Sequence, residues 1–376
     1  EWDVHRVRFG GEGQRLAVSA DGERILIATD AQLAPGDHDQ LTDFYLLEGG
    51  EARLVSGETP PAPADPDQPV FDAMSRDGST VIFETHDPLV PGDTGSITDI
   101  YAWTDGNLAM LTGGAGGWAG GGAPNAMVSD SARQVLFWTA ASLTPDDTDS
   151  AVDAYEWNDG TLQLLSRPNW PAPAEPPWPA YPVAITRDGT RAVFDSGEKL
   201  TDDPDRWAAQ NLYVRDAGGL RLITRRPAGV GADQTASFIG QGFSPDGSQI
   251  YFLTERSLAP DDTDSLDFDL YAYSFPDGST RLISGTSLDP PGPTSSAPKV
   301  RATSTDGSTV VFSTDESLLP ADQNAAVDVY VSRRGAGMRL LTARSPALGG
   351  GAAGTDTYER VAAVDPGAQR ILFTST

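Results

Sequence analysis

One sequence pattern, Leu-x-Pro-x-Asp-x-Asp-x-x-x-Asp-x-Tyr, recurs six times along this chain of 376 residues. The clearest copies span residues 33–45, 89–101, 143–155, 258–271 and 318–330, and a worn copy spans residues 200–213. Each copy follows a turn of the Asp-Gly type and a short apolar strand, and two further strands come after it. A repeat of this length built only from strands is typical of a β-propeller, in which each repeat forms one blade.

The turn between the first two strands of each repeat marks the period most clearly. These turns lie at Asp21-Gly22, Asp77-Gly78, Asp130-Ser131, Asp188-Gly189, Asp246-Gly247, Asp306-Gly307 and Asp365-Pro366-Gly367. An Asp-Gly pair between two apolar runs favours a hairpin, because both residues tolerate a positive φ. With the two strands that follow the Asp-rich loop, each repeat is expected to form four antiparallel strands.

The number of blades depends on the two ends of the chain. Six repeats are complete, whereas residues 360–376 supply only the first two strands of a seventh. Residues 2–9 have the pattern of an outer strand without a partner, and pairing them with the C-terminal hairpin removes exposed strand edges. We therefore expect a single all-β domain over residues 1–376, a seven-bladed β-propeller with four-stranded antiparallel blades whose last blade is closed by the N-terminal strand. Six blades plus an appended hairpin is the alternative.

Two motifs within the repeat resemble those of a known family. Ser-x-Asp-Gly-x-x-(apolar)-x-Phe, at residues 75–83 and 304–312, resembles the WD40-like repeat of the TolB-type β-propellers. Pro-Gly-Asp-x-x-x-x-x-Asp-(Ile/Phe)-Tyr, at residues 35–45 and 91–101, is similar to repeats of secreted bacterial propeller proteins. The resemblance covers nearly the whole chain and implies the fold. It leaves function open, because such propellers serve as binding modules, assembly scaffolds and enzyme domains.

The chain is strongly acidic, with a formal net charge of -28. This charge argues against nucleic acid and anionic membrane surfaces as partners. No apolar run approaches the roughly 18 residues of a transmembrane helix, so we expect no membrane insertion. Cysteine is absent, which excludes disulfides and thiolate metal sites. Aspartate far outnumbers glutamate, and aspartate is the acid of tight loops and of oxygen-ligand metal sites.

The Asp-rich loops are the candidate metal sites. In Asp147-Thr-Asp149-Ser-Ala-Val-Asp153, carboxylates at positions 1, 3 and 7 of a tight loop can converge on one hard cation, with backbone carbonyls and water completing the shell. The expected calcium ligands in the other loops are Asp37, Asp39 and Asp43; Asp322, Asn324 and Asp328; Asp93 and Asp99; and Asp262, Asp264 and Asp269, with Asp267 as an alternative to Asp269.

Two features of these loops leave other interpretations open. The fourth repeat keeps Asp203, Asp205 and Asn211, but Arg206-Trp207 breaks its spacing. Aspartates also cap loops through Asx hydrogen bonds without any metal, and this is the alternative to calcium binding. The Tyr that ends each motif is expected to pack between blades.

Aromatic side chains in the linkers between repeats are the candidate ligand-binding residues. Trp118 lies in a glycine-rich linker, and Trp170, Trp178 and Tyr181 lie in a proline-rich one. Stiff loops that carry flat aromatic faces suit a sugar or a peptide. The alternative is that these side chains fold back and plug the mouth of the central channel.

Enzyme signatures are scarce. His5, His38 and His86 lack the spacing of zinc motifs, and no Gly-x-Ser-x-Gly elbow occurs. Asp195 with Glu198 or Asp233 offers a carboxylate pair, but such pairs are common in an Asp-rich chain.

We therefore expect a calcium-binding β-propeller that acts as a binding or scaffold module for a protein or glycan partner. Because the repeats resemble secreted ones and Glu1 opens the chain as in a processed product, we expect an extracellular, cell-surface or periplasmic location. One alternative is a carbohydrate- or lactone-active enzyme with its site at the central channel. Another is the propeller domain of a larger protein.

Overall fold

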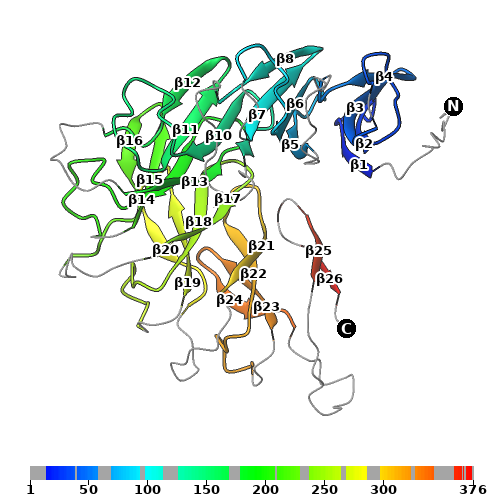
Figure 1. Ribbon diagram of the computed structural model, residues 1–376. Coiled ribbons are helices and arrows are strands. Elements are labelled where there is room, and N and C mark those ends of the chain that lie inside the picture. Colours follow the sequence, from blue (N-terminus) through cyan, green and yellow to red (C-terminus); the bar gives the residue numbers. More distant parts are fainter. Residues whose placement is uncertain are drawn as a thin grey trace. The chain divides into compact units, whose positions relative to one another are not determined.

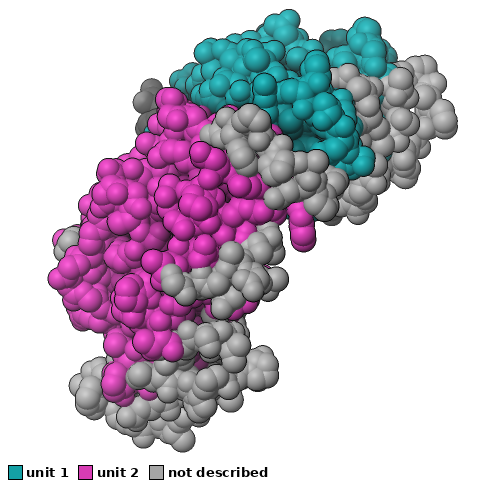
Figure 2. Space-filling view, turned by 90° about the vertical axis from the view of Figure 1, so that its left-hand side faces the viewer, with its two compact units in different colours: residues 1–167, 179–182 teal, residues 168–178, 183–376 magenta. Residues whose placement is uncertain are grey.

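The computed structural model describes residues 14–38, 40–57, 69–93, 98–112, 126–168, 178–207, 210–228, 237–263, 268–285, 297–322, 327–342, 360–365, 367 and 370–374. The chain divides into two compact units (Figure 2). Unit 1 contains Glu1–Arg167 and Pro179–Pro182, and unit 2 contains Pro168–Trp178 and Val183–Thr376.

Unit 1 holds three four-stranded sheets. The first contains β1 (Gln14–Val18), β2 (Arg24–Thr29), β3 (Asp43–Glu48) and β4 (Glu51–Leu54). The second contains β5 (Val70–Met74), β6 (Thr80–Thr85), β7 (Asp99–Thr104) and β8 (Asn107–Met110). The third contains β9 (Met127–Val128), β10 (Gln134–Thr139), β11 (Asp153–Asn158) and β12 (Thr161–Leu164).

The remaining sheets belong to unit 2, although β13 begins in residues of unit 1. One sheet contains β13 (Ala180–Ile185), β14 (Ala192–Ser196), β15 (Asn211–Asp216) and β16 (Gly219–Leu222). The next contains β17 (Ile239–Phe243), β18 (Gln249–Thr254), β19 (Asp269–Ser274) and β20 (Thr280–Leu282). The last four-stranded sheet contains β21 (Lys299–Thr303), β22 (Thr309–Thr314), β23 (Asp328–Arg333) and β24 (Gly337–Leu340), and β25 (Arg360–Val364) pairs with β26 (Ile371–Thr374) alone.

Every four-stranded sheet is an up-and-down meander in which neighbouring strands follow one another in sequence (Figure 1). Where registers are described, the pairing is antiparallel, so the predicted all-β blades are confirmed, and the described ranges contain no helix. These ranges therefore contain no helix that is long and apolar enough to cross a membrane. The seventh blade stays a prediction, because residues 2–9, expected to close it, lie outside the described residues.

A β-bulge recurs in the first strand of several sheets. It lies between Phe71 and Ala73 in β5, between Gly240 and Gly242 in β17, and between Val300 and Ala302 in β21. The two-stranded sheet has the same irregularity, between Val361 and Ala363. The β25–β26 pair therefore has the register of the first two strands of a blade, as the repeat predicted.

The core of each unit lies between adjacent sheets. In unit 1, Leu26 and Phe44 of the first sheet pack with Val81 and Tyr101 of the second. In unit 2, Tyr251 of one sheet packs with Tyr330 of the next. The predicted packing of the motif tyrosines between blades is thus confirmed. Five of the six also stack on a phenylalanine of their own sheet, as in the Phe83–Tyr101 pair at 5.6 Å between ring centroids, whereas Tyr45 lies opposite Ile27.

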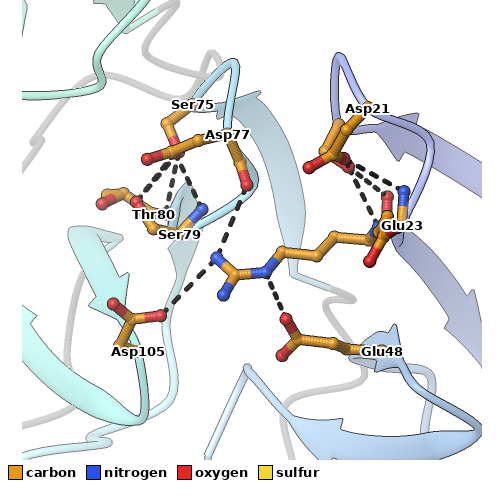
Figure 3. Close-up of polar contacts among 10 residues, drawn as sticks. Asp21, Glu23, Glu48, Ser75, Asp77, Ser79, Thr80 and Asp105 are labelled. Carbon is orange, nitrogen blue, oxygen red and sulfur yellow. Dashed lines mark hydrogen bonds and ion pairs between the residues drawn. The ribbon is translucent and has the colours of Figure 1, made fainter.

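The Ser-x-Asp-Gly turn is a closed hydrogen-bonded unit (Figure 3). Ser75 Oγ donates to Asp77 Oδ1 at 2.7 Å and accepts from the Thr80 backbone N–H at 2.9 Å, while Asp77 Oδ1 also accepts from the Ser79 N–H at 3.0 Å. Gly78 supplies the positive φ of 72° that the turn requires. The recurring serine and aspartate therefore specify the turn rather than a binding site.

Candidate functional site

The loop between β10 and β11 begins with a tight turn. The Asp147 N–H donates to the Thr144 carbonyl at 3.1 Å, and Pro145 occupies the second position of the turn, where its fixed φ is favourable. The same bond forms at Asp37, Asp93, Asp262 and Asp322. The Pro of the repeat thus sets the direction in which the first aspartate leaves the sheet.

The first aspartate of the loop is fixed by the motif tyrosine. The buried Tyr155 hydroxyl donates to Asp147 Oδ2 and accepts from the Leu143 N–H at 3.2 Å. Burial and the adjacent Asp147 carboxylate raise the pKa of Tyr155 above its ordinary value, so the hydroxyl keeps its proton. The other described pairs of this kind are Tyr45–Asp37, Tyr101–Asp93, Tyr271–Asp262 and Tyr330–Asp322.

The last aspartate of the loop is fixed by a hydroxyl at the end of the fourth strand. Ser166 Oγ donates to Asp153 Oδ1, and both residues are buried. The equivalent pairs are Ser56–Asp43, Thr112–Asp99, Ser284–Asp269 and Thr342–Asp328. These aspartates therefore serve the sheet as well as the loop, and hydrogen bonds of the capping type also occur in the loop, from the Asp149 N–H to Asp147 Oδ1 at 3.4 Å.

The three aspartates of the β10–β11 loop come together. Asp147, Asp149 and Asp153 each offer a carboxylate oxygen, and these oxygens lie within 4.8 Å of one another. Asp147 and Asp153 are buried, whereas Asp149 is exposed and accepts from the Ala151 N–H at 2.7 Å. Three like charges at such separations repel one another unless a cation neutralises them. Hard oxygen ligands in a loop suit calcium.

The other predicted metal loops are described in part. Asp39, Asp264 and Asn324, their middle ligands, lie outside the described residues, as does Asp267. Their first and last aspartates occupy the same framework positions as Asp147 and Asp153. Within the described ranges, Asp147, Asp149 and Asp153 are the one group of three potential ligands that converges.

The worn loop between β14 and β15 contains cations of its own. Arg225 Nη2 lies 2.8 Å from Asp203 Oδ2, and Arg226 Nη2 lies 3.9 Å from Asp205 Oδ1. The buried Trp207 takes up space in this loop, and its backbone N–H donates to Asn211 Oδ1 at 2.8 Å. Arginine therefore neutralises the acids of this loop.

The candidate ligand-binding aromatics fall into two groups. Trp118 and Trp170 lie outside the described residues. Trp178 is 45% exposed, and its backbone N–H donates to Glu198 Oε1 at 3.1 Å. Tyr181 packs edge-on against Trp138, with 5.0 Å between ring centroids. Their role in binding stays a prediction.

Sequence reasoning missed a buried pair of acids in unit 1, Asp72 on β5 and Glu84 on β6. Glu84 is 1% exposed, and neither of its carboxylate oxygens nor Asp72 Oδ2 has a hydrogen-bond donor when both groups are ionised. Burial, then the Asp72 charge, raises the pKa of Glu84 to about 9, and burial raises that of Asp72 to about 7. The one signal available was an acid directly after the apolar run Val81-Ile82-Phe83.

Comparison with known proteins gives structural similarity at low identity. TolB from Acinetobacter baumannii is 16% identical over 85% of this chain and 63% of TolB, with a TM-score of 0.35. An oligogalacturonate lyase in complex with manganese is 14% identical over 95% of this chain and 84% of that one, with a TM-score of 0.43. The β-propeller domain of the Trilobed protease from Pyrococcus furiosus is 11% identical over 89% and 84%, with a TM-score of 0.40. No protein-family model and no curated protein matches the chain.

Proposed function

We propose that this chain is a calcium-binding β-propeller that works outside the cytoplasm as a binding or scaffold module for a protein or glycan partner. The observation that carries the proposal is the convergence of Asp147, Asp149 and Asp153 within 4.8 Å. Calcium takes six to eight oxygens, so three carboxylates supply part of its shell, and carbonyls or water supply the rest.

The contrast between two loops of the same chain supports calcium. Arg225 and Arg226 neutralise the worn loop. Among the described residues, no arginine or lysine forms a salt bridge with Asp147 or Asp149, and the nearby Arg167 pairs with Asp146 at 3.1 Å instead. A divalent cation supplies the charge that arginine supplies in the other loop.

The number of ligands ranks the sites. We expect the loops led by Asp37, Asp147 and Asp322 to bind calcium more tightly than those led by Asp93 and Asp203. The second loop has Gly95 where a middle ligand is needed, and the fourth has lost the spacing. In this proposal calcium binds loops in which the hydroxyls of a Tyr and of a Ser or Thr already hold the first and last aspartates. Binding therefore requires little further ordering of the chain.

The proposed recognition surface lies at the end of the sheets that carries the Asp loops. In a four-stranded meander, the loop after the second strand and the linker after the fourth leave at the same end. The exposed Trp178 belongs to such a linker and offers a rigid apolar face. A glycan or a peptide strand is the class of ligand that suits it.

Two alternatives of another class stay open. Three or more acids or histidines that converge on the innermost strands would favour a carbohydrate- or lactone-active enzyme, and the pair of Asp72 on β5 and Glu84 on β6 supplies two acids. The chain can equally be the propeller domain of a larger protein. Activity assays on oligosaccharides and lactones distinguish the enzyme from the module.

Calcium titration after chelation tests the proposal. Calcium should stabilise the folded protein by about 2.7 kcal/mol per site at a hundredfold excess over Kd. Asp149→Asn should remove one site from the stoichiometry. Asp130→Asn changes the same charge in the first turn of the same sheet and should keep every site. The proposal fails if chelator leaves the melting temperature unchanged and mass analysis finds no calcium.

A further inference from the structure

A small cavity of about 130 Å³ lies within unit 2, at the end of the sheets opposite the Asp loops. The turn between β19 and β20 contributes Ser274, Asp277 and Ser279 to its lining, and β20 contributes Arg281. Gln249 of β18 and Arg334, from the turn between β23 and β24, complete its polar surface. Arg281 is half-buried, whereas Arg334, Asp277 and Ser279 are exposed, so two arginines line one pocket at the surface.

Neither arginine side chain forms a hydrogen bond or salt bridge among the described residues, although the nearby Asp277 carboxylate interacts with the charge of Arg334. Arg281 forms no hydrogen bond or salt bridge there, and its Nη2 is buried. Burial and the charge of Arg334 lower the pKa of Arg281, yet an arginine stays protonated at neutral pH. The Arg334 guanidinium also forms no described salt bridge. A half-buried arginine without an ion pair, such as Arg281, is unexpected in a chain with 54 acids and 26 lysines and arginines.

The preceding sheet has an arginine at the position equivalent to Arg281, and that arginine is paired with a carboxylate. Arg221 on β16 lies opposite Val214, as Arg281 lies opposite Ala272. Arg221 Nη2 is 2.5 Å from the carboxylate of Asp216, the last residue of β15. The last residue of β19, at the same place, is Ser274. The second site therefore has a serine where the first has the carboxylate that pairs with its arginine, and the carboxylate it does have, Asp277, forms no salt bridge with Arg281.

The other polar groups around the cavity define the anion further. Asp277, the one carboxylate in the lining, accepts from the Ser279 N–H at 3.1 Å and Oγ at 2.8 Å. Gln249 is buried, and its Oε1 has no donor. An anion that satisfies this site brings acceptors for two arginines and one O–H group for Gln249. Hydrogen phosphate has both, whereas sulfate has no proton to donate at neutral pH.

We propose that this cavity binds inorganic phosphate, with Arg281 and Arg334 pairing with its charged oxygens and Gln249 accepting its O–H group. The site is separate from the Asp loops and does not depend on calcium. Arginine is suited to this role, because its planar fork matches two oxygens of a phosphate group.

The site is tested by calorimetric titration with phosphate of protein from which calcium has been removed with a chelator. The ionic strength is kept constant with sodium chloride. Arg281→Gln should weaken phosphate binding about tenfold or more, because a charge-assisted hydrogen bond is lost. Ser274→Asp should do the same by restoring the carboxylate of the preceding sheet. Arg339→Gln, at the equivalent exposed position of β24, should bind like the unaltered protein.

The pattern of results decides between outcomes. Phosphate bound more weakly by both cavity variants, with their melting temperatures retained in chloride, supports the site. Ser274→Asp introduces no cavity and serves as the test if Arg281→Gln folds poorly. Unaltered protein that shows no phosphate binding, or cavity variants that bind like Arg339→Gln, would overturn the proposal. Sulfate binding as tight as phosphate binding would overturn the role of Gln249.

Discussion

The hydroxyl of Tyr155 donates a hydrogen bond to the carboxylate of Asp147, eight residues earlier in the chain. The ring of Tyr155 is part of the core and stacks on Phe137 at 5.8 Å between centroids. The position of a loop carboxylate is therefore set by the packing of the sheet beneath it. The same relationship recurs in four other repeats, which explains why the aspartate and the tyrosine recur together in the sequence.

Removing this hydroxyl should destabilise the protein. Tyr155→Phe keeps the ring and deletes one donor to a buried carboxylate, so we expect a loss of about 1.5–3 kcal/mol in the free energy of unfolding. Urea unfolding at neutral pH in the presence of chelator measures this loss without a contribution from metal.

Tyr213→Phe is the matched control. The Tyr213 hydroxyl donates to the carbonyl oxygen of Glu198 at 2.7 Å, which is a neutral acceptor. Its loss should cost about 1 kcal/mol. Equal losses in the two variants would mean that the charge of Asp147 adds nothing to the bond.

The buried pair Asp72 and Glu84 should make the free energy of unfolding depend on pH. The pKa of Glu84 is raised, so the folded protein binds a proton more tightly than the unfolded chain. Its stabilising contribution is complete below the ordinary glutamate pKa and is lost as the pH rises through about 9. Glu84→Gln removes this dependence and leaves an amide that can donate to Asp72. The variant should gain stability over the unaltered protein as the pH rises from 5 to 9, by at most ~1.4 kcal/mol per pH unit.

Thermal unfolding at several pH values tests this expectation. Glu51→Gln, a substitution at an exposed position of β4 in the same unit, is the control and should follow the unaltered protein. Parallel pH profiles for Glu84→Gln and the unaltered protein would show that the buried pair does not titrate in the folded state.

The parts of the fold that depend on local chemistry were predictable from the sequence. Asp-Gly turns, Pro-led loops and apolar runs define strands wherever each signal acts within a few residues. The recurring bulge was not predictable, because one extra residue breaks the alternation from which a strand is recognised. Asp72 lies within that bulge, so its approach to Glu84 did not follow from the repeat.

The candidate sites were predictable only where the repeat itself carries them. Asp147, Asp149 and Asp153 converge as their spacing indicated. The pocket around Arg281, by contrast, depends on Ser274 of the neighbouring strand and on Arg334 from the next sheet. Such relationships between distant residues arise from register and packing and leave no local pattern.

Alanine substitutions of two glycines in equivalent turns distinguish the cost of backbone strain from the cost of a steric clash. Gly307 has a φ of 64° and Gly22 a φ of 79°, so alanine is strained at both. A Cβ at Gly307 would lie 2.5 Å from the Tyr251 hydroxyl oxygen, whereas a Cβ at Gly22 meets nothing within 4 Å. Gly307→Ala should therefore cost about 1–3 kcal/mol more than Gly22→Ala. Denaturant unfolding of both variants measures the difference, and equal costs would mean that Tyr251 moves aside freely.

Substitutions of the two described linker aromatics, Trp178 and Tyr181, should affect ligand binding and stability differently. Trp178 is exposed, so Trp178→Ala should leave the melting temperature within about a degree or two of the original and abolish binding to a glycan or peptide identified on an array. Tyr181 packs on Trp138, so Tyr181→Ala should lower the stability by about 0.5–1.5 kcal/mol beyond the loss from burial. If Trp178→Ala binds normally, the recognition surface lies elsewhere. If it unfolds at a markedly lower temperature, Trp178 belongs to the framework, as the plug interpretation holds.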